Sequence, residues 1–78
     1  MKTFKVLGSG CKNCVATADL IERKAKETGI EVKIEKVTDM GEIMGYGVMS
    51  TPGVVIDETV VHAGGMPTAA QIEEWIKE

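Results

Sequence analysis

The sequence lacks the features that mark secreted, membrane-bound and nucleic-acid-binding proteins. Its formal net charge at pH 7 is −3, so it offers no basic surface to nucleic acid. No apolar run approaches the length of a membrane span, and residues 1–7 are too short and too interrupted by lysine for a signal peptide. We therefore expect a cytoplasmic protein with no membrane partner and no nucleic-acid partner.

Histidine and cysteine are scarce as well, with one histidine and two cysteines among 78 residues. A closed zinc site needs four ligands, so zinc is disfavoured here. In the reducing cytosol, a pair of cysteines is more often catalytic or metal-binding than structural. A chain of this length has room for one domain, residues 1–78, with one small core, and we expect a monomer.

The two cysteines, Cys11 and Cys14, lie between an apolar strand, Phe4–Leu7, and a helical pattern. Cys11 falls at the helix start, where free backbone N–H groups and the positive end of the helix dipole favour a thiolate. The residues that recur on the side of Cys14 at helical spacing are Ala18, Ile21, Ala25 and Thr28. Cys14 is therefore predicted to be buried, and we interpret Cys11 as the attacking thiol and Cys14 as the resolving thiol.

The remaining segments predict the element order βαβαββα. Strands are expected at Lys2–Leu7, Ile30–Val37, Gly53–Ile56 and Thr59–Ala63, with helices up to Thr28, over Asp39–Val48 and after Thr68. The first strand, helix and second strand form a βαβ unit, whose two strands should be parallel. The last two strands form a hairpin through Asp57-Glu58, which we interpret as an unexceptional turn.

Capping and packing follow from the same patterns. Asp39 with Glu42 and Thr68 with Gln71 are predicted capping boxes. The side chains assigned to the core of the later helices are Met40, Ile43, Met44, Ala69, Ile72, Trp75 and Ile76. His62 is expected to be an ordinary sheet residue, and Tyr46 to pack at the end of the second helix.

The second half of the chain contains two further motifs. Residues 46–52 (YGVMSTP) are followed at once by the strand Gly53–Ile56, and Gly64-Gly65 follows the last strand. The first motif resembles the approach to the cis-proline of the thioredoxin superfamily, and the second resembles the loop that closes the family's substrate groove. With the Cys-x-x-Cys motif after the first strand, the resemblance covers essentially the whole chain. It is a resemblance to the small, glutaredoxin-sized redox proteins of bacteria and archaea. It implies an α/β fold with a four-stranded mixed sheet flanked by helices.

The resemblance also implies a function and a set of site residues. It implies a thiol–disulfide oxidoreductase that reduces protein or small-molecule disulfides through Cys11 and Cys14 and needs no metal or cofactor beyond this redox-active disulfide. The residues implied around the substrate are Lys12, Thr51, Pro52, Gly64 and Gly65, with the Thr51–Pro52 bond cis. The implied partners are a dithiol or flavin disulfide reductase and disulfide-containing substrate proteins.

Some features depart from the family, and one rival interpretation stays open. No buried acid placed like that of thioredoxin is evident, and Met66-Pro67 follows the two glycines, which leaves glutathione use open. Met49 and Met66 fall either in the loops around Cys11 or in the core. A strand, a Cys-x-x-Cys motif and a helix also resemble the start of copper chaperones, whose paired thiolates bind Cu(I). That family needs two strands directly after the helix, where this chain predicts one strand and then a helix.

Overall fold

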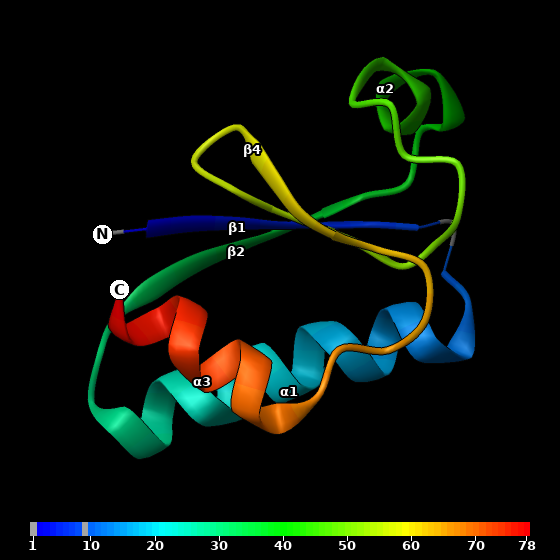
Figure 1. Cartoon of the computed structure of the whole chain (residues 1–78). Coiled ribbons are helices and arrows are strands. Elements are labelled where there is room, and N and C mark those ends of the chain that lie inside the picture. Colours follow the sequence, from blue (N-terminus) through cyan, green and yellow to red (C-terminus); the bar gives the residue numbers. More distant parts are fainter. Residues whose placement is uncertain (1, 9) are drawn as a thin grey trace.

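The computed structural model describes residues 2–8 and 10–78, and a four-stranded sheet flanked by helices accounts for most of them (Figure 1). The elements are β1 (Lys2–Leu7), α1 (Lys12–Thr28), β2 (Val32–Val37), α2 (Met40–Gly45), β3 (Gly53–Ile56), β4 (Thr59–Ala63) and α3 (Ala69–Lys77). The order βαβαββα is the predicted one. One strand and then a helix follow α1, contrary to the copper-chaperone interpretation.

The strands lie in the order β2-β1-β3-β4, which makes β2 and β4 the two edges. β1 and β2 are parallel, as the βαβ unit predicts, while β3 is antiparallel to both β1 and β4. β2 begins at Val32 and not at the predicted Ile30. The reason is the end of α1, where Gly29 takes the left-handed conformation and the Ile30 N–H donates to the Ala25 carbonyl. The chain therefore needs two further residues before it can join the sheet.

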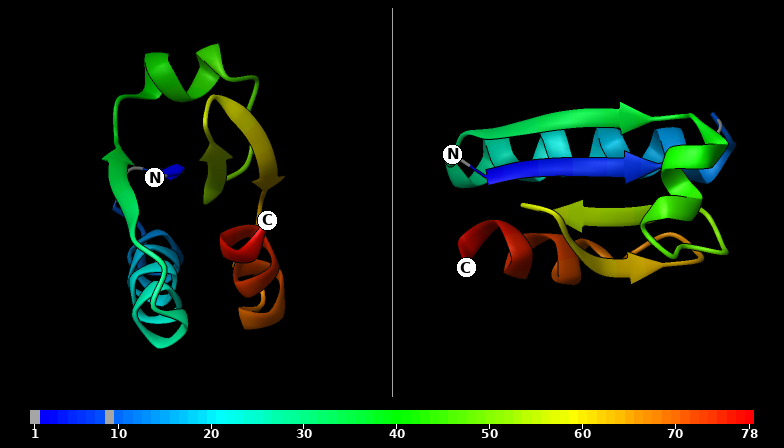
Figure 2. Two further views of the ribbon diagram at one scale, coloured as in Figure 1. Left: turned by 90° about the vertical axis from the view of Figure 1, so that its left-hand side faces the viewer. Right: turned by 90° about the horizontal axis from the view of Figure 1, so that it is seen from above.

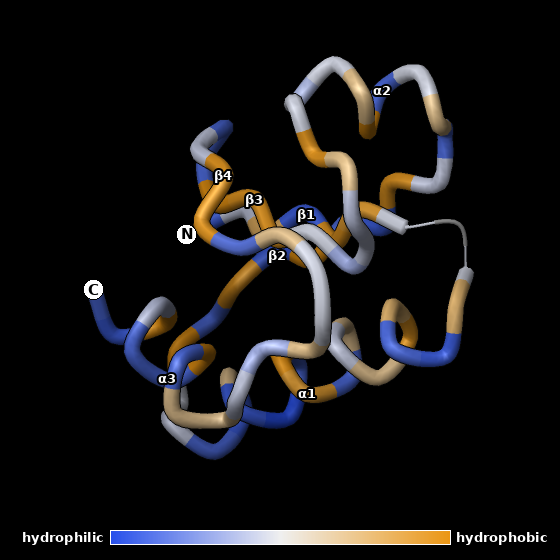
Figure 3. The backbone as a smooth tube through the Cα atoms, turned by 45° about the vertical axis from the view of Figure 1, so that its right-hand side comes forward, coloured by the Kyte–Doolittle hydropathy of each residue, from blue (hydrophilic) through white to orange (hydrophobic). Residues whose placement is uncertain are grey.

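The helices cover the two faces of the sheet unequally (Figure 2). α1 and α3 lie side by side on one face, over a core that contains Phe4, Val6, Ile21, Val54 and Ile72. α2 crosses only one end of the other face, over a smaller cluster of Leu7, Ile43, Val48 and Val55. Figure 3 shows hydrophobic segments on the strands, whereas hydrophobic and hydrophilic segments alternate along the helices. The first core is continuous, and the second is confined to the end that α2 covers.

The prediction that Met40 and Met44 belong to the core is wrong. Their exposed fractions are 58% and 70%, whereas Ile43 between them is 1% exposed. α2 has only six residues, and Ile43 is the one that it buries against the sheet. A helix this short cannot bury a complete row of apolar side chains. The prediction that Ala69 packs into the core is also wrong. It is exposed at the first position of α3, whereas Ile72 and Ile76, farther along the helix, are buried.

The two predicted helix caps differ. Thr68 and Gln71 form the complete capping box, with Thr68 Oγ1 accepting from the Gln71 N–H at 3.1 Å and Gln71 Oε1 accepting from the Thr68 N–H at 2.9 Å. Asp39 does cap α2, but its carboxylate accepts from the Gly41 N–H at 2.7 Å. Gly41 is the second residue of α2, whereas a capping box uses the N–H of the third, Glu42. Within the part of the chain that the structure describes, Glu42 returns no hydrogen bond to Asp39, so the predicted box does not form.

The turn between β3 and β4 is not the unexceptional turn that was predicted. Asp57 and Glu58 have φ values of 46° and 70°, a left-handed conformation that usually selects glycine or asparagine. Side-chain contacts hold the turn: Asp57 Oδ1 accepts from the Thr3 N–H at 3.1 Å, and Glu58 Oε1 accepts from Lys5 Nζ at 2.6 Å. The Lys5 ammonium lowers the pKa of Glu58, and the Glu58 carboxylate raises the pKa of Lys5.

Candidate active site at the Cys11–Cys14 pair

The cysteine pair lies where β1 ends and α1 begins, at the opposite end of the sheet from Lys2 and Glu78 (Figure 1). Cys11 is the N-cap residue of α1 and is exposed, whereas Cys14, in the first helical turn, is 5% exposed. This is the difference in exposure that the helical spacing predicted. The two residues form a disulfide, and their Cα atoms are 5.0 Å apart.

The start of α1 favours negative charge at Cys11. Cys11 Sγ accepts a hydrogen bond from the Cys14 N–H at 3.2 Å, so the sulfur takes the place that a capping oxygen holds in other helices. The first turn contains no acidic residue. The positive end of the dipole of a 17-residue helix therefore acts on the sulfur without a competing carboxylate in that turn.

Gly8, directly after β1, leaves no room for a side chain. A Cβ atom built on Gly8 would overlap Cys14 Sγ and would lie 3.7 Å from Thr51 Cβ. The Gly8 N–H donates to the Val37 carbonyl at 2.9 Å, which fixes this backbone to the sheet. The Gly8 backbone is therefore the spacer between Cys14 and Thr51. Sequence reasoning missed this role, although a glycine at the end of a strand is a recognised sign of close approach.

The loops that contain Thr51-Pro52 and Gly64-Gly65 are joined to one another. The Thr51–Pro52 bond is cis, Pro52 is buried and Thr51 is exposed. The Pro52 carbonyl accepts from the Gly64 N–H at 3.0 Å, and a Cβ on Gly64 would come within 3.1 Å of Ser50 Cβ. Gly64 has a φ of +80°, so it can make this contact in a conformation that other residues rarely adopt. The structure thus brings four of the predicted substrate residues into one pair of linked loops.

His62 has a contact that the sequence did not suggest. It lies in β4 as predicted, but its Nε2 is 2.9 Å from the Gly65 carbonyl. Its ring also packs against Trp75 of α3, with 6.0 Å between the ring centroids. His62 therefore links the Gly64-Gly65 loop to α3. Nothing in the sequence indicated this link beyond the short separation between His62 and the two glycines.

Lys12 is the predicted site residue with the least support from contacts. It is exposed, and within residues 2–8 and 10–78 its side chain forms no ion pair. Apolar side chains are more prominent around the site. Met49 is 98% exposed just before the Thr51-Pro52 loop, Met66 is 42% exposed just after Gly65, and Val15 is 43% exposed next to Cys14. The loop interpretation of the two methionines is therefore favoured over core packing.

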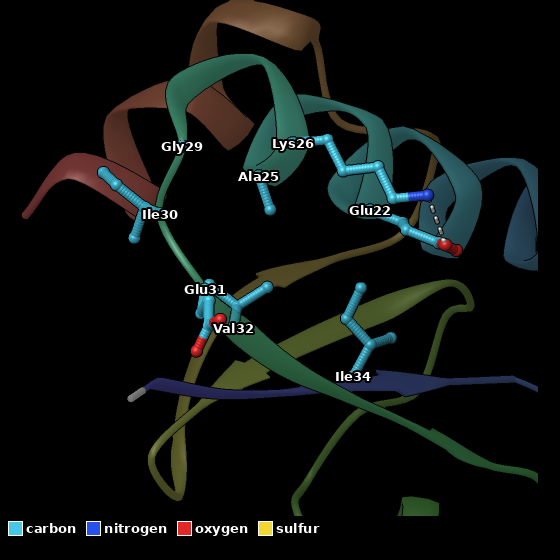
Figure 4. Close-up of a pocket in the computed structure, with 8 residues that line it drawn as sticks. All are labelled: Glu22, Ala25, Lys26, Gly29, Ile30, Glu31, Val32 and Ile34. Atoms are coloured by element: carbon cyan, nitrogen blue, oxygen red, sulfur yellow. Dashed lines mark ion pairs between the residues drawn. The ribbon is translucent and has the colours of Figure 1, made fainter.

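Among the residues that the structure describes, the cavity lined by Cys14 is small. The cavity beside Cys14 has a volume of about 30 Å³, while a groove of about 550 Å³ lies at the other end of α1 (Figure 4).

Among the described residues, no group of three or more metal-ligating side chains could hold a metal ion. No helix of the described chain is long and apolar enough to cross a membrane.

Comparison with known proteins identifies relatives of this arrangement. Residues 2–77 match a family model described as a thioredoxin domain. A thioredoxin of Methanocaldococcus jannaschii is 36% identical over 77 residues, which cover 99% of this chain and 88% of that protein. A thioredoxin of Methanothermobacter thermautotrophicus is 27% identical over 74 residues, which cover 95% of this chain and 96% of that protein. The family match spans the cysteine pair and both loops.

Proposed function

Because the chain belongs to the thioredoxin family and is a thiol–disulfide oxidoreductase, we propose that Cys11 attacks the substrate disulfide and that Cys14 resolves the intermediate. The observation that carries this assignment is the unequal exposure of the two sulfurs. Cys11 is exposed and receives the Cys14 N–H, whereas Cys14 is 5% exposed and faces the Gly8 backbone. An incoming disulfide can reach the first sulfur and not the second.

The reaction proceeds in two exchanges. The Cys11 thiolate attacks one sulfur of the substrate, the substrate S–S bond breaks, and the other substrate sulfur leaves as a thiolate that takes up a proton. The Cys14 thiolate then attacks Cys11 Sγ, which forms the Cys11–Cys14 disulfide and releases the second substrate thiol. The substrate gains two electrons and two protons, and the protein ends as the disulfide found in the structure. A dithiol or flavin-dependent reductase in the cytosol returns the pair to the dithiol.

The thiolate of Cys11 gains more from one hydrogen bond than from the helix dipole. A dipole contributes about 0.3–1 kcal/mol, whereas a hydrogen bond to a charged group contributes roughly 1.5–3 kcal/mol. One pKa unit corresponds to about 1.4 kcal/mol. The Cys14 N–H is therefore the main source of thiolate stabilisation in this proposal. Lys12, exposed in the same turn, adds a screened positive charge.

The substrates proposed are extended protein segments that contain a disulfide. Thr51 is exposed next to buried Pro52, and in this proposal its backbone forms the main-chain hydrogen bonds to the substrate. Gly64-Gly65 borders this loop through the bond from the Gly64 N–H to the Pro52 carbonyl. The exposed side chains of Met49, Met66 and Val15 provide flexible apolar contacts. A surface of this kind suits varied protein segments better than a single small ligand, which would need an enclosed pocket.

The test compares the two cysteines in the reduced protein. Mild alkylation should modify Cys11 before Cys14, and Cys14→Ser should retain mixed disulfides with protein substrates that non-reducing gels can detect. Cys11→Ser serves as the matched control and should retain none. Faster alkylation of Cys14, or mixed disulfides that accumulate in Cys11→Ser, would reverse the assignment.

A further inference from the structure

The outer edge of β2 is free to accept another strand. β2 has β1 as its only neighbour in the described sheet, and Figure 2 shows it at the outer side, above α1. The Val37 carbonyl accepts from the Gly8 N–H, so Val37 directs its backbone toward β1. Since backbone direction alternates along a strand, Lys33 and Glu35 also face β1. The N–H and C=O groups of Val32, Ile34 and Lys36 therefore face outward.

A groove lies directly beneath this edge. We call it the edge groove; its lining residues are Glu22, Ala25, Lys26, Gly29, Ile30, Glu31, Val32 and Ile34, and its volume is about 550 Å³. Figure 4 shows Val32 and Ile34 pointing from β2 toward α1. The rim contains the Lys26–Glu22 ion pair at 3.3 Å. A strand added beside β2 could form backbone hydrogen bonds with this edge, and its side chains could pack against the apolar residues of the edge groove.

We propose that the strand that binds there is β2 of a second copy of this chain, so that the protein forms a dimer in place of the monomer expected from the sequence. Two identical copies normally associate about a two-fold axis, which makes the paired strands antiparallel. Outward-facing residues must then pair with outward-facing residues, which restricts the registers. In the register centred on Ile34, Lys33 lies opposite Glu35 of the second copy, and Glu35 lies opposite its Lys33. The charges of this edge are complementary to themselves.

The neighbouring registers are excluded by the same charges. A register centred on Lys33 places two lysines opposite one another, and a register centred on Glu35 places two glutamates opposite one another. Like charges directly opposite on paired strands are unfavourable. Charged side chains often prevent association of sheet edges. Charges of one sign would oppose every register, whereas the alternating signs of Lys33 and Glu35 permit the register centred on Ile34.

The side chains of this pairing divide between the two faces of the sheet. Lys33 and Glu35 lie on the face that α2 covers, 3.3 Å apart, with side chains 62% and 39% exposed. Across the two-fold axis they become four charges of alternating sign. Ile34 faces the helices, where it would meet Ile34 of the second copy above the edge groove. Cys11 is at the other end of α1, a helix of about 25 Å by its length, so both cysteine pairs remain accessible.

The test exchanges charges in the oxidised protein, which cannot form intermolecular disulfides. Lys33→Glu and Glu35→Lys should each raise the dissociation constant of the dimer about tenfold or more, measured by sedimentation equilibrium at low ionic strength. An equimolar mixture of the two variants should form heterodimers, because each glutamate of one copy then lies opposite a lysine of the other. The double variant Lys33→Glu/Glu35→Lys should dimerise as the wild type does. Glu74→Lys, on α3, is the control with the same change of charge as Glu35→Lys and should dimerise normally.

Three results would overturn the proposal. They are a wild type that stays monomeric up to millimolar concentration, a dimer that both single variants retain, and a double variant that fails to recover. Reduction of a small disulfide by all variants should equal that of the wild type. That readout separates this proposal from the function proposed for the cysteines, which stands or falls on Cys11 and Cys14 alone.

Discussion

The two ends of α1 are built on opposite principles. At the first end, Cys11 and Cys14 are joined to one another, Gly8 touches Cys14 with no space for a methyl group, and the nearest cavity is about 30 Å³. At the last end, Ile30 is 38% exposed beside a groove of about 550 Å³. The larger of these two cavities is therefore not the one beside the reactive cysteines. Disulfide exchange needs two sulfurs at a fixed separation and an open approach, and it needs no enclosed pocket.

Gly8→Ala tests the tight end and should have the largest effect. The added methyl group would overlap Cys14 Sγ and lie 3.0 Å from Cys14 Cβ, and neither atom is the free tip of a flexible chain. Overpacking of this kind costs about 1–3 kcal/mol. We expect the free energy of unfolding to fall by that amount in urea titrations of the oxidised protein. We also expect slower thiol–disulfide exchange at Cys11 and Cys14.

Gly45→Ala is the matched control for this substitution. A Cβ on Gly45 meets no atom within 4 Å, and the residue has no positive φ. The same chemical change should therefore stabilise the protein by about 0.4–1 kcal/mol, through the unfolded state. Equal effects of the two substitutions would show that the contact between Gly8 and Cys14 does not constrain the site.

Ile30→Ala tests the open end, where we expect a smaller loss. Ile30 is already 38% exposed, so its truncation removes only part of the burial of an isoleucine. The free energy of unfolding should fall by no more than about 1 kcal/mol, measured in urea at low protein concentration. A loss of about 2–5 kcal/mol, typical of a fully buried isoleucine, would mean that this end is packed as tightly as the cysteine end.

Glu58→Gln should have the smallest effect and a dependence on pH. Glu58 lies in the turn between β3 and β4, at the same end of the sheet as the segment that joins α1 to β2 (Figure 1), and Lys5 lowers the pKa of Glu58. Since the pKa is lower in the folded protein, the contribution of Glu58 is complete above the unfolded value of about 4.3 and is lost as the pH falls through the folded value.

The measurement is the urea midpoint of wild type and Glu58→Gln between pH 7 and pH 2.5. The wild type should be slightly more stable at pH 7, and the difference should vanish at the acid end. Glu74→Gln, in α3 and without an ion pair among the described residues, should show no such difference. A gap that persists at the lowest pH would assign the effect to packing of the Glu58 side chain instead of its charge.

Much of the fold was predictable because local patterns and tertiary packing agree. The alternation along β2, the glycine after Thr28 and the cap at Thr68 each specify a local structure that the sheet then uses. The exposure of Cys11 and burial of Cys14 followed from helical phase alone. These are properties of neighbouring residues, and a sequence states them directly.

The errors arose where distant contacts decide. Met44 reads as an inward residue, but α2 is too short to bury it. Glu58 adopts a left-handed conformation because Lys5 and Tyr46, both far away in sequence, hold its carboxylate. Two further features depend on the pairing of the strands. One is the close approach of Gly8 to Cys14, and the other is which backbone groups of β2 face away from β1.

The hydrogen bond from the Gly64 N–H to the Pro52 carbonyl gives this molecule a built-in reporter. Proline has no N–H, so the proline itself is silent in amide exchange and in amide NMR spectra. The Gly64 amide is the partner that such methods can observe. Its signal registers any separation of the two loops. Contact of the proposed substrate segment with these loops can therefore be followed at a single amide, without a label and without a change to either sulfur.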